Sequence, residues 1–161
     1  MIEKHPFGPF VPQDAKYLIL GSFTGKEGVK GQPYYDDSYD WFYGTKRNQF
    51  WPMLEAVYDL KLNNITRKKK LFTKLGIAIA DIIYQCEREG GSNLDSNLKI
   101  IVYCKDSIIE ILQRNQIEKI YFTSRYVEHK FKQNFKDVNF LYSYIEFVYL
   151  PSPSPRNSFF N

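Results

Sequence analysis

The amino-acid sequence predicts an α/β fold in which helices cover both faces of a parallel sheet. Four apolar segments of strand length alternate with segments that carry the helical period. The length of 161 residues is that of about one domain. Hydrophobic residues make up 43% and charged residues 25% of the chain, which is typical of a globular protein and excludes a disordered one. We therefore expect a single domain over residues 1–161.

Each predicted strand is a short apolar run that ends at a glycine, a proline or a polar residue. The four runs are residues 16–20, 77–80, 119–122 and 147–150. The residues that follow them are Gly21, Asp81, Thr123 and Pro151. Open parallel sheets bind their ligands beyond the carboxyl ends of the strands, so we expect the functional site at this edge.

Two helices are expected between the first and second strands. In the first helix, apolar residues recur at i, i+3, i+4, i+7 and i+8, and they are Phe50, Met53, Leu54, Val57 and Tyr58. Asn48 occupies the N-cap position of this helix. The second helix spans residues 67–75 and ends at Gly76, and its basic run at 67–70 is typical of a solvated helix face.

Two further helices carry capping signals. Ser107 and Glu110 have the spacing of a capping box, which predicts a helix from Ser107 to about residue 115. Thr123 or Ser124 is expected to cap a helix that runs to about residue 134.

Composition excludes several classes of protein. No apolar run reaches the ~20 residues that a membrane span needs, and the N-terminus lacks the apolar core of a signal peptide. Cys86 and Cys104 are too few for a disulfide scaffold, which favours the reducing cytoplasm. The two histidines and two cysteines show no metal-ligand spacing, so no metal site is expected.

Charge and aromatic content leave two interpretations open. The chain has a net charge of +4, and 17% of its residues are aromatic, including 13 Tyr and 13 Phe. A basic, tyrosine-rich surface suits a nucleic acid, whose bases stack on aromatic rings. Alternatively, the Tyr and Phe side chains fill the core.

The segment after the first strand, GSFTGK at residues 21–26, is similar to a phosphate-binding loop but does not match one. The Walker pattern has four residues between its glycines and Ser or Thr after its Lys, whereas here three residues separate the glycines and Glu27 follows Lys26. A dinucleotide-binding fingerprint is excluded because no third glycine opens a helix. A nucleotide-binding enzyme is therefore the weakest candidate, and the glycines indicate a turn whose backbone approaches a ligand closely.

Four segments together carry a family resemblance. They are GSFTG at 21–25, FYGTKRNQFW at 42–51, GIAIADIIYQCEREGGSNLDSNL at 76–98 and LPSPSPRN at 150–157. In this order they resemble the uracil-DNA glycosylase superfamily, most closely its hypoxanthine-DNA glycosylase branch, with similarity to the mismatch-specific uracil glycosylases. The resemblance spans about residues 5–157.

The resemblance implies a three-layer α/β/α sandwich around a central four-stranded parallel sheet. It also implies a monofunctional DNA glycosylase of base-excision repair. Such an enzyme flips a deaminated base, uracil or hypoxanthine, out of DNA and hydrolyses its N-glycosidic bond to leave an abasic site. It is expected to act as a monomer on DNA, without a metal, a cofactor or a membrane.

The resemblance assigns residues to the base site. Gly21, Ser22 and Phe23 belong to the motif that contacts the flipped base. Tyr43, with Phe42 as its neighbour, matches the aromatic residue that stacks on that base. The residues expected to contact the DNA backbone or enter the duplex are Arg47, Ser152, Ser154 and Arg156.

Two residues are candidates for catalysis. Asn48 matches the amide of the hypoxanthine branch that holds the attacking water through hydrogen bonds. Asp81 matches the position where an Asn reads uracil in other branches. An ionised carboxylate accepts hydrogen bonds but donates none, so Asp81 favours a base edge that carries N–H groups.

Departures from the family pattern support an alternative function. Phe23 stands where many branches have an Asp or Asn that positions water, and Leu150 stands where some have a His that stabilises the departing base. The acidic stretch at 36–40 is an insertion that either repels DNA or supplies a water-activating carboxylate. The alternative is a catalytically silent relative that binds nucleic acid through the same pocket.

Overall fold

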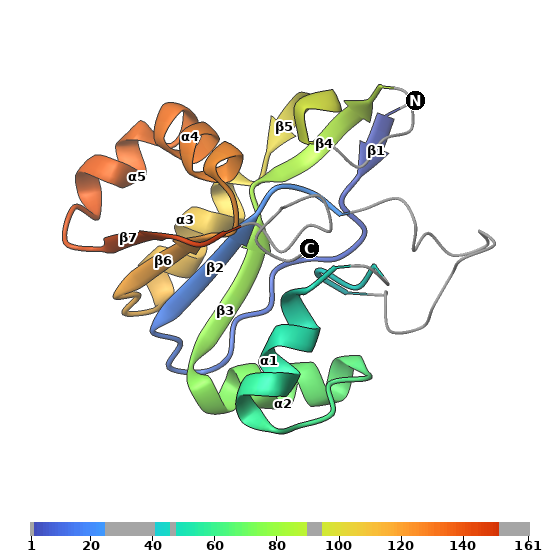
Figure 1. Cartoon of the computed structure of the whole chain (residues 1–161). Helices are drawn as coiled ribbons and strands as arrows, with labels where there is room; N and C mark the ends of the chain where they lie inside the picture. Colours follow the sequence, from blue (N-terminus) through green and yellow to red (C-terminus); the bar gives the residue numbers. More distant parts are fainter. Residues whose placement is uncertain (1, 25–40, 46–47, 90–94, 152–161) are drawn as a thin grey trace.

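Four parallel strands form the central sheet, in the spatial order β3-β2-β6-β7 (Figure 1). They are β2 (Tyr17–Gly21), β3 (Ile77–Asp81), β6 (Lys119–Phe122) and β7 (Glu146–Tyr149). The structure is a computed structural model that describes residues 2–24, 41–45, 48–89 and 95–151, the Ser96 side chain excepted. All four strands expected from the sequence are thus confirmed. Gly21 of β2 pairs with Asp81 of β3, so the carboxyl ends of these two strands lie side by side.

Helices cover both faces of the central sheet, as a three-layer sandwich requires (Figure 1). On one face lie α1 (Phe50–Tyr58) and α2 (Ile65–Leu75). On the other lie α3 (Lys105–Arg114), α4 (Arg125–Asn134) and α5 (Lys136–Leu141). The predicted fold class is confirmed, although α5 was not expected.

A second, antiparallel sheet stands beside the central one and was also not expected. Its strands are β1 (Ile2–Lys4), β4 (Ile83–Arg88) and β5 (Leu98–Tyr103), in the order β1-β4-β5. A single residue, Ile82, separates β3 from β4, so the chain passes from one sheet directly into the other. A 3-10 turn, η2 (Asp95–Asn97), leads into β5. This sheet fixes the N-terminal segment, because the backbone N–H of His5 donates to the Tyr84 carbonyl at 2.8 Å.

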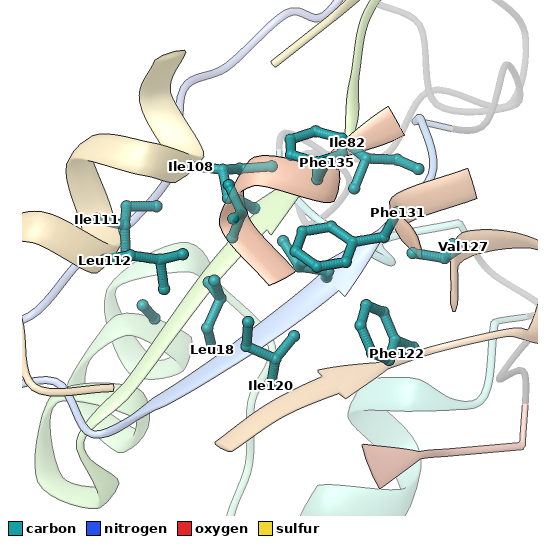
Figure 2. Close-up of a cluster of buried hydrophobic side chains, with 14 of the residues drawn as sticks. Leu18, Ile82, Ile108, Ile111, Leu112, Ile120, Phe122, Val127, Phe131 and Phe135 are labelled. Carbon is teal, nitrogen blue, oxygen red and sulfur yellow. The ribbon is translucent and has the colours of Figure 1, made fainter. Parts of the chain in front are cut away.

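The main apolar core lies between the central sheet and the helices α3 and α4 (Figure 2). Leu18 and Leu20 of β2 face this core, whereas Ile19 faces the opposite side, as the alternation of a strand requires. The rings of Phe131 and Phe135 are stacked, with their centroids 4.7 Å apart. Each such buried Phe stabilises the fold by roughly 1.5–3 kcal/mol relative to an exposed one.

The opposite face of the sheet is packed with aromatic rings. Those at most 5% exposed are Trp41, Phe42, Phe50, Trp51 and Phe72. The two indole rings are stacked, with centroids 5.7 Å apart. The interpretation that Phe and Tyr side chains fill the core is thus confirmed for Phe, whereas no described Tyr is among the buried core residues.

The same aromatic cluster corrects one expectation. Lys68 is 2% exposed, so the basic run at 67–70 is not entirely a solvated face. Its ammonium nitrogen lies 4.9 Å from the centroid of the Trp51 ring. A cation over the face of an indole is attracted by the negative charge of the ring face, which stabilises the buried Lys68.

The first helix does not bury the apolar stripe that its periodicity predicts. Met53, Val57 and Tyr58 are 43%, 70% and 42% exposed. The residues that α1 buries are Phe50 and Trp51, because its first turn provides the contact with the aromatic cluster. The helix also begins later than expected, since Gln49 is its N-cap. Asn48 still contributes to this end, because its Oδ1 accepts from the Phe50 N–H at 2.9 Å.

Of the caps predicted for α3 and α4, the one at Ser124 is confirmed and the one at Ser107 is not. The Ser124 side chain accepts from the Val127 N–H and caps α4, as expected. The capping box at Ser107 is wrong, because α3 begins two residues earlier, at Lys105. The Ser107 hydroxyl donates to the Cys104 carbonyl at 3.4 Å instead of accepting from the backbone.

Candidate functional site

Polar side chains meet at the carboxyl ends of β2, β3 and β6. Gly21 is in contact with two of them. A Cβ at this position would overlap the Tyr43 hydroxyl and lie 2.5 Å from Asp81 Oδ1. The two oxygens therefore occupy the space that a side chain would fill, and only glycine fits here. The convergence of Gly21, Asp81 and Thr123 at one edge, predicted from the strand order, is confirmed.

Tyr43 is held from both ends. Its hydroxyl donates to Thr123 Oγ1 at 3.2 Å, and Thr123 in turn donates to the Leu20 carbonyl at 3.2 Å. Its ring packs against the Phe50 ring, with centroids 4.5 Å apart. Its φ of 56° lies in the left-handed region, which is strained for a residue with a bulky side chain. Burial and the negative charge of Asp81 raise the pKa of Tyr43 well above its usual value, so the phenol is neutral.

Asp81 forms a buried ion pair with His5. Asp81 Oδ2 and His5 Nε2 are 2.6 Å apart, and both side chains are at most 5% exposed. The second ring nitrogen, Nδ1, lies 2.6 Å from the Phe7 carbonyl oxygen. Burial lowers the pKa of His5, but the hydrogen bond to Asp81 and the charge of Asp81 outweigh it, and the pKa is raised above 6.5.

A second carboxylate, Asp95, contacts the first motif. Ser22 Oγ donates to Asp95 Oδ1 at 2.6 Å. Burial raises the pKa of Asp95, and the neighbouring negative charge of Asp81 raises it further. Burial and the negative charge of Asp81 also raise the pKa of the Cys104 thiol to about 12. The strand ends thus bring the Asp81 and Asp95 carboxyl groups near each other, and His5 is the described residue whose side chain pairs with Asp81.

The other predicted base-site residues lie around this centre. Phe23 meets the His5 ring edge-on, with centroids 5.4 Å apart, and Phe42 lies 5.7 Å from the same ring. The Phe42 carbonyl also accepts from Trp51 Nε1 at 2.6 Å. Asn48 reaches the site through Phe50, whose N–H it binds and whose ring supports Tyr43.

The four predicted DNA-binding residues lie outside the described parts of the chain, and they are Arg47, Ser152, Ser154 and Arg156. The acidic stretch at 36–40 lies outside them as well. Conversely, sequence analysis did not identify His5 or Asp95 as site residues. Asp95 lies within the third motif, so its carboxylate could have been predicted as a site residue. No sequence pattern around His5 indicates a functional role.

A small cavity of about 20 Å³ borders the ion pair. Its lining consists of His5, Phe7, Pro9, Phe42, Ala80, Asp81, Cys104 and Ser107. This volume holds one water molecule and no nucleobase. Within the described residues, no group of three or more His, Cys, Asp or Glu side chains is placed to bind a metal ion. None of the helices in this part of the chain is long and apolar enough to cross a membrane.

Comparisons with known proteins find similarity to a solved structure but to no protein family. No protein-family model matches the chain, and no curated protein matches it. The solution NMR structure of a "putative uracil DNA glycosylase" from Methanosarcina acetivorans is similar, with a TM-score of 0.64 and 22% sequence identity. The match covers 100% of this chain and 90% of that one. At this identity the similarity establishes a shared α/β fold.

Proposed function

We propose that this protein is a DNA glycosylase. It takes a deaminated base, uracil or hypoxanthine, out of the DNA stack and hydrolyses its N-glycosidic bond, which leaves an abasic site. The observation that carries the proposal is the meeting of Tyr43 Oη and Asp81 Oδ1 over Gly21 at the strand ends. The fold shared with the Methanosarcina protein, whose name gives the same class of enzyme, supports it.

The proposed base site combines an aromatic ring with a hydrogen-bond acceptor. A flipped base needs a flat partner for its ring and polar groups for its edge. Tyr43 supplies the ring, and it is fixed by Phe50 and Thr123 before any base arrives. Asp81 supplies the acceptor, and it is fixed by His5. Such rigid support preserves the geometry that binding and catalysis need.

Asn48 is the residue that we propose to hold the attacking water. One lone pair of Oδ1 is taken by the Phe50 N–H, which leaves a second lone pair and the amide hydrogens. An amide is not a strong base. In cleavage of this kind the sugar becomes oxocarbenium-like, so the water needs positioning more than deprotonation.

The DNA contacts of the proposed enzyme come from the segment that precedes α1 in the sequence and from the last motif. Arg47, Ser152, Ser154 and Arg156 are proposed to bind phosphates or to enter the duplex, and the enzyme is proposed to act as a monomer without a cofactor. Phosphate contacts fix the orientation of the DNA, while the base is read in the pocket.

One observation favours a second candidate function, a silent relative that only binds nucleic acid. Phe23 replaces the polar water-positioning residue of many branches. Its ring packs between the His5 ring and the guanidinium of Arg88, which lies 5.8 Å from the ring centroid. Phe23 therefore takes part in packing, and catalysis depends on Asn48 alone or on residues 36–40.

Base release from labelled duplexes tests the proposal. Duplexes with uracil, hypoxanthine or xanthine are incubated with stoichiometric protein and treated with alkali. We expect strand scission on the uracil or the hypoxanthine duplex. Asn48→Ala should slow release by about 100-fold or more, whereas the exposed Asn63→Ala should not. An unchanged rate in Asn48→Ala would transfer the water-holding role to residues 36–40.

Absence of scission on all three duplexes would refute the enzyme. Binding to these duplexes that weakens steeply with salt, without release of any base, would then identify the silent relative, because phosphate contacts displace counterions.

A further inference from the structure

The contacts of the His5 ring indicate where its hydrogens lie. Nε2 is 2.6 Å from Asp81 Oδ2, and Nδ1 is 2.6 Å from the Phe7 carbonyl oxygen. The Phe7 N–H is a weaker neighbour of Nδ1, at 3.4 Å. A neutral imidazole carries a hydrogen on only one nitrogen, so one of the two short contacts would place lone pair against lone pair unless the Asp81 carboxyl supplied the hydrogen. Because imidazole is a much stronger base than a carboxylate, the hydrogen between Nε2 and Oδ2 resides on His5.

This pairing leaves one oxygen of Asp81 for the base site. Oδ2 is engaged by His5, whereas Oδ1 lies beside Gly21 and the Tyr43 hydroxyl. Across the described ranges, no side-chain or backbone group donates a hydrogen bond to Oδ1. Among the described residues, Oδ1 is therefore the Asp81 oxygen that can accept from a base, and it lies beside the Tyr43 hydroxyl.

Resting on the proposed function, we infer that His5 is a positioning residue that holds Asp81 Oδ2 and presents Oδ1 to a ring N–H of the flipped base. Deamination of cytosine changes ring N3 from an acceptor to an N–H donor, and deamination of adenine does the same at N1. Oδ1 thus reads the one ring atom that both deaminations change. The substrate class is therefore deaminated bases, both pyrimidines and purines. Cytosine and adenine are disfavoured, because the lone pair of their ring nitrogen would face the lone pairs of the carboxylate.

The charge of His5 has a second consequence. The departing base gains negative charge in the transition state, and an isolated carboxylate beside it would oppose that charge. The imidazolium makes the His5–Asp81 pair neutral overall, and in a buried site such neutralisation counts for more than in water. Thr123 and Tyr43 add neutral hydroxyl groups to this edge, and the Asp95 carboxyl, whose pKa is raised by burial, also lies near Asp81. His5 therefore allows an acidic residue to read the base without repelling it as it leaves.

Nitrogen NMR of the histidine side chains tests the ion pair without any substrate. At about pH 7.5, where an ordinary histidine is mostly neutral, we expect both ring nitrogens of His5 to show the signals of a protonated imidazolium. In Asp81→Asn one of them should move to the unprotonated position. The chain has two histidines, so His129→Gln identifies the signals. A singly protonated His5 in the wild-type protein would overturn the inference.

Release rates from two matched duplexes test the specificity. One duplex carries hypoxanthine, which has a hydrogen on N1, and the other carries unsubstituted purine, whose N1 is an acceptor. The ratio of the hypoxanthine rate to the purine rate should fall about 10- to 100-fold in Asp81→Asn, because the amide can also donate to N1. His5→Gln should lower the same ratio, and His129→Gln should not.

The ratio separates a positioning role from a structural one. Loss of folded protein or of general activity slows both duplexes equally and leaves the ratio unchanged. An unchanged ratio in His5→Gln would therefore refute the inference. If the wild-type protein releases no base from any duplex, the proposed function fails. The preference is then measured as the dissociation constant of the purine duplex divided by that of the hypoxanthine duplex, and the inference stands only if His5→Gln lowers this quotient.

Discussion

Replacement of Gly21 by alanine is the smallest change that disturbs the proposed site. The added Cβ would overlap the Tyr43 hydroxyl and lie 2.5 Å from Asp81 Oδ1, closer than the 3.0 Å limit of real Cβ contacts. Neither neighbour can move freely. Tyr43 is held by Thr123 and by the Phe50 ring, and Asp81 is held by His5.

The expected magnitude follows from these contacts. Overpacking of a well-packed region by one methyl group costs about 1–3 kcal/mol. For a chain of this length, each kcal/mol lowers the melting temperature by about 2–4 °C, so Gly21→Ala should melt about 2–12 °C below the wild type. Displacement of a site residue by about 1 Å can slow catalysis roughly 100-fold, so base release should fall by about that factor.

Thermal unfolding by circular dichroism and single-turnover base release measure the two effects. Gly8→Ala is the matched control, because a Cβ at Gly8 meets nothing within 4 Å. In the Gly21→Ala background, Tyr43→Phe removes the overlapping hydroxyl and should restore part of the lost stability. If Gly21→Ala melts and releases base like Gly8→Ala, the packing of the site described here is wrong.

Two further predictions concern stability. Because the pKa of His5 is raised in the folded state, its stabilisation is complete below about pH 6.5 and is lost as the pH rises through the folded pKa. Urea unfolding should show the wild type losing stability relative to the neutral pair His5→Gln/Asp81→Asn over that rise, and a constant difference would contradict the ion pair. Ser124→Ala should lower the free energy of unfolding by about 1 kcal/mol, because Ser124 caps α4. Ser107→Ala, which removes no cap, should change it by less than about 0.5 kcal/mol, and equal effects of the two variants would refute the capping assignment.

The central sheet was predictable because buried parallel strands are continuous apolar runs with clear ends. Residues 17–21 and 77–81 each stop at the residue that enters the site. The antiparallel sheet was not predictable in the same way. Only Ile82 separates β3 from β4, so no turn or loop in the sequence marks the point where the chain passes from one sheet to the other. The β4–β5 pairing also shifts its register near Gln85, which blurs the alternation of a half-exposed strand.

The candidate site was predictable only where topology brings neighbouring strand ends together. Gly21 and Asp81 meet because β2 and β3 pair in parallel. His5 reaches Asp81 across 76 residues of sequence, and Ser22 reaches Asp95 across 73. Both contacts depend on the antiparallel sheet, and no local pattern predicts a pairing at such separation.

The central proposal is that a flipped nucleobase contacts both Tyr43 and Asp81. A crystal structure with a duplex that carries a 2′-fluorinated, hydrolysis-resistant deoxyinosine or deoxyuridine tests it directly. Fluorine at this position disfavours the oxocarbenium-like state and keeps the base attached. We expect the base outside the duplex, with its ring against Tyr43 and its ring N–H directed at Asp81 Oδ1. A base that remains stacked in the duplex, or that lies in contact with neither residue, would contradict the claim.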